Sequence, residues 1–393
     1  MTVKNKFIPF SPPWIGREEI AEVVDTLRSD WITTGPKTRR FEEEFRKFVK
    51  ADAALALSSC TAGLHLALVL EGIGPGDAVI TTPMTFCSGV NVIEQAGALP
   101  VLADIEPRTL NIDPEAVGKI LKNKSTRKKI KAILAVHYAG HPCEMDALTK
   151  LADRYGLKII EDAAHAIPSD YKGRRIGGLG NLTAFSFYGT KNLTTAEGGM
   201  LTGSPRLIEK ARLLSLHGMN RDAWKRYSKE GSWRYDVVVP GFKYNMTDIQ
   251  ASLGLVQLKK LPKFQVRRRA IVENYNKAFS QLRELQIPSE LPHAKSAWHL
   301  YVLRVNPGKA KVSRDQLIKK LRKKGIGTSV HFIPIHLHSY YRKKYGFKPN
   351  DFPVAYREYQ RLVSLPLYPK LDEAQQKRVI GAVKMIVRRL SLS

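Results

Sequence analysis

The chain has 393 residues, 43% of them hydrophobic and 25% charged, a composition that is typical of a folded globular protein and excludes a disordered one. Its 64 lysine and arginine residues outnumber its 36 acidic residues, which gives a formal net charge of +28. Its three cysteines form no C-x-x-C pair, which excludes a disulfide framework and fits a reducing compartment.

The sequence of the N-terminal part of the chain indicates helices and no membrane-spanning segment. Residues 1–16 lack the apolar core of a signal peptide. Residues 17–30 predict a helix with one buried face, because apolar residues recur at helical spacing: Ile20, Val23, Val24 and Leu27. Polar residues interrupt the apolar stretch 53–74, so we expect a strand, a turn and a helix there. We therefore expect a cytoplasmic protein without an integral membrane segment.

Short apolar runs then alternate with helical patterns as far as residue 187. The predicted strands are 54–58, 78–82, 99–105, 131–137, 157–162 and 183–187. Helical stretches such as 61–72 and 145–156 separate several of them. This alternation predicts an α/β fold with a mostly parallel sheet and helices on both faces.

From about residue 247 the pattern changes. Residues 247–261 and 267–282 predict long helices, with Thr247 as the N-cap of the first. Two strands, 298–305 and 327–336, and a final amphipathic helix, 375–390, follow. We expect a large α/β domain with an N-terminal arm (1–262) and a smaller C-terminal α+β domain (263–393).

Chemically distinctive residues follow several of these strands. Asp162 ends one strand, Lys191 follows another 29 residues later, the turn "SSCTAG" (58–63) precedes a helix, and Phe86 follows a further strand. Loops at the carboxyl ends of parallel strands converge on one crevice. A lysine, a carboxylate, a helix N-terminus for a phosphate and an aromatic ring are the groups that pyridoxal phosphate (PLP) requires. Each feature alone is ordinary, and together they favour PLP without identifying it.

Longer motifs give the chain a resemblance to a known family. "WITTGP", "SSCTAGLHLAL", "IIEDAAHA", "FSFYGTKNLTTAEGG" and "PGFKYNMTDIQA" are similar to the motifs of the DegT/DnrJ/EryC1/StrS sugar aminotransferases, which have the PLP enzyme fold of type I. The likeness covers essentially the whole chain. Within the family, "VHYAG", "YKGRRIG", "HGMNRDAW" and "AWHL" resemble the UDP-4-amino-4-deoxy-L-arabinose–oxoglutarate type.

The resemblance implies a set of site residues. Lys191 would form the Schiff base with PLP, and Asp162 would hold the proton on the pyridine nitrogen. The other expected cofactor contacts are His165 near the phenolic oxygen, Ser186, Thr61 and Ala62 at the phosphate, Phe86 stacked on the ring, and Asn245 reaching the phosphate of a neighbouring subunit. The last contact implies a homodimer with shared active sites.

The implied reaction moves the amino group of glutamate, through the pyridoxamine form of the cofactor, to the C4 ketone of a nucleotide-linked keto-sugar, with UDP as the expected nucleotide. The resemblance places this reaction in the synthesis of a cell-surface glycan or of a lipid A (lipopolysaccharide) precursor. Arg221 and His331 are candidate substrate contacts. Two alternatives stay open: a C3 aminotransferase acting on a dTDP-keto-sugar, and a non-catalytic regulatory or nucleic-acid-binding protein on the same scaffold. The scattered basic runs and the lack of a nucleic-acid-binding motif argue against a specific nucleic acid partner. We expect no metal site, because no carboxylate lies close to the histidines of "HFIPIHLH" (331–338).

Overall fold

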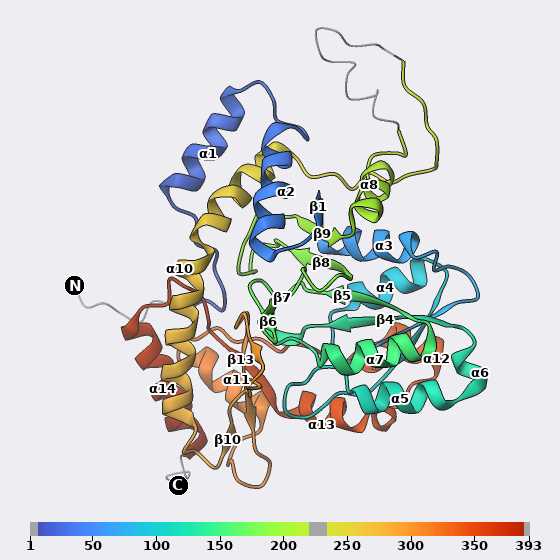
Figure 1. Cartoon of the computed structure of the whole chain (residues 1–393). Coiled ribbons are helices and arrows are strands. Elements are labelled where there is room, and N and C mark those ends of the chain that lie inside the picture. The colour runs from blue at the N-terminus through green and yellow to red at the C-terminus, as the bar shows by residue number, and fades with distance from the viewer. Residues whose placement is uncertain (1–6, 220–233, 389–393) are drawn as a thin grey trace.

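A seven-stranded sheet forms the centre of the computed structural model, which describes residues 7–219 and 234–388 (Figure 1). The strand order is β1-β9-β8-β5-β4-β2-β3. Strands from β3 to β8 pair in parallel, and β9 is antiparallel to both of its neighbours. The strands are β1 (Ala53–Leu57), β2 (Ala78–Thr81), β3 (Leu99–Leu102), β4 (Ile130–Val136), β5 (Lys158–Asp162), β8 (Leu182–Ser186) and β9 (Gly199–Gly203). The predicted α/β fold is confirmed.

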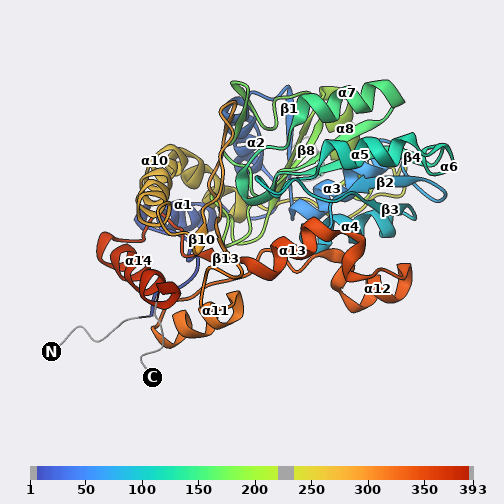
Figure 2. The ribbon, with the colours of Figure 1, turned by 90° about the horizontal axis from the view of Figure 1, so that it is seen from below.

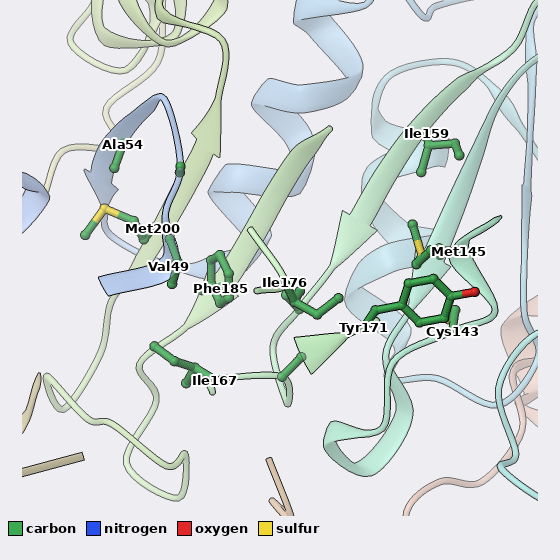
Figure 3. Close-up of a cluster of buried hydrophobic side chains, with 14 of the residues drawn as sticks. Val49, Ala54, Cys143, Met145, Ile159, Ile167, Tyr171, Ile176, Phe185 and Met200 are labelled. Carbon is green, nitrogen blue, oxygen red and sulfur yellow. The ribbon is translucent and has the colours of Figure 1, made fainter. Parts of the chain in front are cut away.

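Helices cover both faces of this sheet, because alternate residues of each strand point to opposite sides. In β4, Ile133 and Ala135 join one core cluster, whereas Ala132 and Leu134 join another. The first cluster includes α2 (Pro36–Val49), α5 (Pro114–Lys122), α7 (Met145–Tyr155) and the first half of α10 (Asp248–Phe279). The second includes α3 (Cys60–Leu70), α4 (Cys87–Gln95) and α8 (Pro205–Leu214). Figure 3 shows part of the first cluster, with Phe185 and Met200 from the strands.

Helix α10 carries the chain from this layer to a second core. We predicted two helices, but Asp248–Phe279 is one continuous helix that contains Pro262. Thr247 caps it as predicted, through a reciprocal pair of hydrogen bonds with Gln250. The second core joins the last part of α10 to β10 (Leu285–Gln286), β12 (Tyr301–Val305), β13 (Leu362–Leu365), α11 (Arg314–Lys323) and α14 (Glu373–Arg388).

This division of the core supports our proposal of a domain boundary near residue 262. The last member of the first cluster is Leu261, and the second cluster resumes on the same helix at Ile271. The N-terminal arm contributes to the second core, since Ile8 packs there and pairs with Ile326.

The remaining elements lie around these two cores. Figure 2 shows α12 (Ser339–Tyr345) and α13 (Pro353–Arg361) beside α4 and β3. The short elements are α6 (Lys124–Arg127), β6 (Asp170–Tyr171), β7 (Arg174–Arg175), β11 (Ala294–Lys295) and the 3-10 turns η1 (Tyr138–Gly140), η2 (Ile335–Leu337) and η3 (Pro349–Asp351). No helix in the described ranges is long and apolar enough to cross a membrane.

Two further predictions from sequence patterns were wrong. Helix α1 (Arg17–Arg28) forms, but its apolar face is not buried in this chain: Ile20 is 58% exposed and Leu27 is 53% exposed. The predicted strand 327–336 is also absent, apart from a single bridge between Ser329 and Ser364 and the turn η2. This segment instead lies near the carboxyl end of β2, where the amide of Ile335 donates to the carbonyl of Pro83.

Candidate active site

The candidate site lies at the carboxyl ends of β5 and β8, beside the first turn of α3. Asp162 is the last residue of β5, and its neighbour in register on β8 is Ala184. Ser186 ends β8, and Lys191 lies on the loop that follows it. Within this loop the Lys191 amide donates to the carbonyl of Tyr188, and the Thr195 amide donates to the carbonyl of Phe187. Because β5 and β8 run parallel, Asp162 and Lys191 lie at the same carboxyl end of the sheet.

Asp162 is a buried carboxyl group, 5% exposed. Its Oδ1 accepts a hydrogen bond from the Ala164 amide at 3.0 Å. Burial raises the pKa of Asp162, whereas that amide and the nearby positive charge of Lys191 act in the opposite direction. A buried carboxylate of this kind is stabilised by a cationic partner.

Lys191 carries an amine with unusual acidity. Burial lowers the pKa of Lys191 to about 8, although the charge of Asp162 opposes the shift. A substantial fraction of such an amine is neutral near pH 7.5, which is the form that reacts with a carbonyl group. The fold therefore produces a nucleophilic lysine at this position.

Three histidines interact with the charge of this lysine, and one phenylalanine packs against two of them. The ring of His165 stacks on Phe332 with centroids 5.7 Å apart, and its centroid lies 4.4 Å from that of His299. Nδ1 of His331 lies 2.9 Å from the Ser364 hydroxyl. Burial and the charge of Lys191 lower the pKa of His331 to about 4. Burial also holds the pKa of His165 and of His299 well below the usual range, so all three rings are neutral.

The expected phosphate side is the first turn of α3. Thr61 is exposed there and Ala62 is buried. The Ala62 amide donates to the hydroxyl of the N-cap, Ser59, at 3.0 Å, so this amide already has a partner. Gly199 of β9 packs against the same turn, and a Cβ at this position would lie 2.5 Å from the amide nitrogen of Cys60. A glycine is required here because the two backbones are so close.

Phe86 and Asn245 lie at the margins of the site. Phe86 precedes α4, is 59% exposed, and its ring centroid lies 6.1 Å from that of Phe332. Asn245 pairs with Leu57 on the outer edge of β1, two strands away from β8, and donates to the Thr34 hydroxyl at 2.6 Å. Of the described candidates, Asp162, His165 and His331 lie close enough to Lys191 to interact with its charge. Asn245 lies apart, on the outer edge of β1.

Asn245 lines a separate cavity of about 770 Å³, together with Thr34 and Arg212. Its Oδ1 is buried without a hydrogen-bond partner. Arg221, our other candidate, lies outside the described residues. Within the described parts of the chain, no group of three histidine, cysteine or acidic side chains is arranged to hold a metal ion.

These groups fit PLP. The amine with a lowered pKa suits the aldehyde, the buried carboxyl group suits a protonated ring nitrogen, and the N-terminal turn of α3 suits a phosphate. Sequence reasoning missed two neighbours of Lys191, namely Asn192 and His299, both of which are buried. The only available signal was their place in the motifs "GTKN" and "AWHL".

Comparison with known proteins agrees with this chemistry. The model of the DegT/DnrJ/EryC1/StrS aminotransferase family matches residues 13–384. The chain belongs to this family. A spore coat polysaccharide biosynthesis protein of Bacillus subtilis, SpsC, is 51% identical over 387 residues, covering 98% of both chains. An uncharacterized protein of Methanocaldococcus jannaschii, MJ1066, is 52% identical over 386 residues, covering 98% of this chain and 99% of the relative.

Solved structures of family members show the same architecture. The PLP form of a putative sugar aminotransferase of Streptococcus pneumoniae, Spr1654, superposes with a TM-score of 0.90 at 37% identity, covering 97% of this chain and 98% of that one. The same protein is known in its PMP form. As a member of the DegT/DnrJ/EryC1/StrS family, this chain is a PLP-dependent sugar aminotransferase, and the enzymatic reading prevails over the non-catalytic alternative.

Proposed function

We propose that this enzyme transfers the amino group of glutamate to the C4 ketone of a UDP-linked keto-sugar that is a precursor of a cell-surface glycan. The observation that carries the proposal is the placement of Lys191, whose pKa burial lowers to about 8, within range of the charge of the buried Asp162 carboxyl group. The name of the Bacillus subtilis relative supports a polysaccharide product. The UDP and C4 assignments rest on the resemblance to one branch of the family.

In this proposal the cofactor is held by Lys191, Asp162 and the first turn of α3. When bound, PLP carries the amino group and withdraws electrons from the substrate carbon that loses a proton. Ser186, with Thr61 and Ala62, binds the phosphate. Phe86 covers one side of the ring from the start of α4, and His165 lies near the phenolic oxygen.

Lys191 has the central role. Its neutral Nζ accepts a proton from the substrate carbon and returns it to another carbon atom, which is general acid–base catalysis by a single amine. An amine with a pKa near the working pH performs both steps well, because neither protonation state is strongly favoured. Burial, which lowers this pKa, is therefore part of the mechanism.

Asp162 holds a proton on the ring nitrogen of the cofactor. Because burial raises the pKa of this carboxyl group, a cation that forms beside it gains an unusually strong electrostatic partner. The ring nitrogen would thus stay protonated while Asp162 stays ionised. The Ala164 amide, 3.0 Å from Oδ1, keeps the carboxylate in place.

The proposal includes a homodimer with shared active sites. One feature supports it: the apolar face of α1 is exposed in a single chain. A second copy would cover this face, and Asn245 would reach the phosphate of the cofactor bound in that copy. All three cysteines are free, which supports our placement of the enzyme in a reducing cytoplasm.

The test is a substrate panel. Purified enzyme loaded with PLP is incubated with glutamate and with UDP- and dTDP-linked 4-keto- and 3-keto-sugars, and the products are identified by mass spectrometry. We expect amination of a UDP-linked 4-keto-sugar. Amination of a dTDP-linked 3-keto-sugar alone would support the alternative substrate instead, and no amination of any sugar would refute the proposal.

A further inference from the structure

Asn192, the residue after the proposed catalytic lysine, connects three segments of the chain. Its side chain is 4% exposed. Nδ2 donates to the carbonyl oxygen of Ile167 at 2.9 Å and to that of Ala297 at 2.8 Å. Oδ1 lies 3.2 Å from Nδ1 of His299. One buried amide thus joins the Lys191 loop to the segment after β5 and to the segment that leads into β12.

These contacts define the protonation of His299. The two N–H groups of Asn192 are both used by carbonyl oxygens, so its Oδ1 is the atom left for His299. An amide oxygen only accepts, and therefore Nδ1 of His299 must carry the proton. The neutral ring then has its lone pair on Nε2. The backbone of His299 is held as well, because its amide donates to the carbonyl of Ala139 at 3.1 Å.

The ring held in this way lies against the site. The centroids of His299 and His165 are 4.4 Å apart, and His165 also stacks on Phe332 with centroids 5.7 Å apart. His165 therefore contacts two rings, one of which is oriented by Asn192. The same amide holds the backbone that carries Lys191. Lysine and histidine are thus aligned by a single side chain that does not itself touch a reacting atom.

We propose that Asn192 is a positioning residue that fixes Lys191 and His165 relative to each other. It does so by holding His299 in its Nδ1–H form and by linking the lysine loop to the segment after β5 and to the segment before β12. This inference rests on the proposed role of Lys191. The plain alternative is that Asn192 only stabilises the fold, as other buried amides do. The experiment has to separate these two roles.

The matched control is Gln376 on α14. It is 3% exposed, its Nε2 donates to the carbonyl of Ile271 at 2.7 Å, and its Oε1 accepts from Asn274 at 3.1 Å. It belongs to the second core and has no contact with the lysine loop among the described interactions. Asn192→Ala and Asn192→Asp are compared with Gln376→Ala and Gln376→Glu, so that each pair removes or ionises a buried amide.

Four quantities are measured on PLP-loaded proteins: the midpoint of thermal unfolding, the dissociation constant of PLP, the rate of the half-reaction with glutamate alone, and the pH midpoint of the visible absorbance band. We expect all four variants to lower the unfolding midpoint. Only the Asn192 variants should slow the half-reaction, by about 10–100-fold, because small misalignments of reacting groups have effects of this size. Asn192→Asp should also raise the pH midpoint, since it adds a negative charge beside Lys191.

The proposal is overturned if the Asn192 variants lose stability as the Gln376 variants do but keep the wild-type rate and pH midpoint. If Asn192→Asp does not fold, His299→Asn replaces it, because its amide still donates to Asn192 while the ring beside His165 is lost. A wild-type rate in His299→Asn would likewise refute the alignment of His165. Failure of wild-type enzyme to react with any keto-sugar would refute only the proposed function, since the half-reaction contains no sugar.

Discussion

The thiol of Cys60 lies 3.9 Å from Oδ1 of Asp162, beneath the carboxylate that we propose holds the cofactor ring. The same sulfur lies 3.5 Å from the carbonyl oxygen of Ala184. Burial raises the pKa of Cys60 well above the usual range, so the group is a neutral thiol and a weak donor. The Asp162 carboxylate therefore receives little stabilisation from this side, and its stabilisation within the chain comes from the Ala164 amide and the charge of Lys191.

We predict that Asp162→Asn and Cys60→Ala differ sharply. Asp162→Asn keeps the shape of the side chain but loses its charge, so the variant should still bind PLP while kcat falls at least about 100-fold, as when a preorganised electrostatic partner is removed. Cys60→Ala removes only a weak donor and should stay close to wild type. Steady-state kinetics with matched cofactor occupancy checks both, and near-normal turnover in Asp162→Asn would contradict the assigned role.

Lys191→Ala should lose both the visible absorbance of the lysine-bound cofactor and measurable amino transfer. The rate of amino transfer should fall by about 10²–10⁴-fold, the usual contribution of a positioned acid–base group. Lys191→Arg is the control for charge, because it keeps a cation at this position but has no amine that can react with an aldehyde. An unchanged spectrum together with full activity in Lys191→Ala would mean that another residue performs the chemistry.

The pH dependence of cofactor loading follows from the lowered pKa of Lys191. The protonated amine cannot attack an aldehyde, so the rate at which apoenzyme takes up PLP should rise with pH and reach half its maximum near pH 8. An ordinary lysine would place this midpoint above pH 10. In Asp162→Asn the carboxylate that raises the pKa of Lys191 is gone, and the midpoint should move to lower pH. Stopped-flow absorbance over a pH series measures both shifts.

Sharing of active sites predicts complementation between inactive chains. If Asn245 serves the site of a neighbouring subunit, a mixture of Lys191→Ala and Asn245→Ala chains forms mixed dimers in which one of the two sites is intact. Random pairing should then recover about a quarter of wild-type activity. Each variant is refolded or exchanged alone as the control. A mixture that stays as inactive as its components would argue that each site is built from one chain.

Asp248 should be important for stability without taking part in chemistry. Its carboxylate is 1% exposed and accepts hydrogen bonds from the amides of Gly35, Lys37 and Thr38 at the start of α2. Asp248→Ala should lower the free energy of unfolding by about 2 kcal/mol or more, because several charge-assisted bonds are lost and buried amides are left without partners. Urea denaturation checks this. Asp25→Ala, which removes an exposed carboxylate, should have little effect.

Local pattern was sufficient for much of the site. Asp162 and Lys191 were found because each follows a short apolar strand, and the parallel sheet brings such positions to one edge. Pattern was not sufficient for Asn192 and His299. These residues lie more than 100 positions apart and meet only because the segment 297–299 folds back over the lysine loop. No local periodicity reports a contact of this kind.

Two of the wrong predictions, the buried face of α1 and the strand 327–336, have the same physical origin. The spacing of Ile20 and Leu27 describes an apolar helix face, but it does not say what covers that face, and in a single chain nothing in the described residues does. The alternation in 327–336 resembles a strand, yet a strand needs a neighbour with free backbone groups along its length. Here one bridge to Ser364 is formed, and the other backbone hydrogen bonds of the segment go to separate partners, Ile8 and Pro83, rather than to one neighbouring strand.

By itself the sequence determined the α/β architecture, the order of the reactive residues along the chain and the family, because these depend on periodicity and on short motifs. Only the tertiary structure decided which side chains are buried together. Burial is what brings the pKa of Lys191 down to about 8, leaves Asp162 in need of a cation and makes the surrounding histidines neutral. These properties depend on the removal of water from around a charged group, which requires residues from many segments of the fold and not from one segment alone.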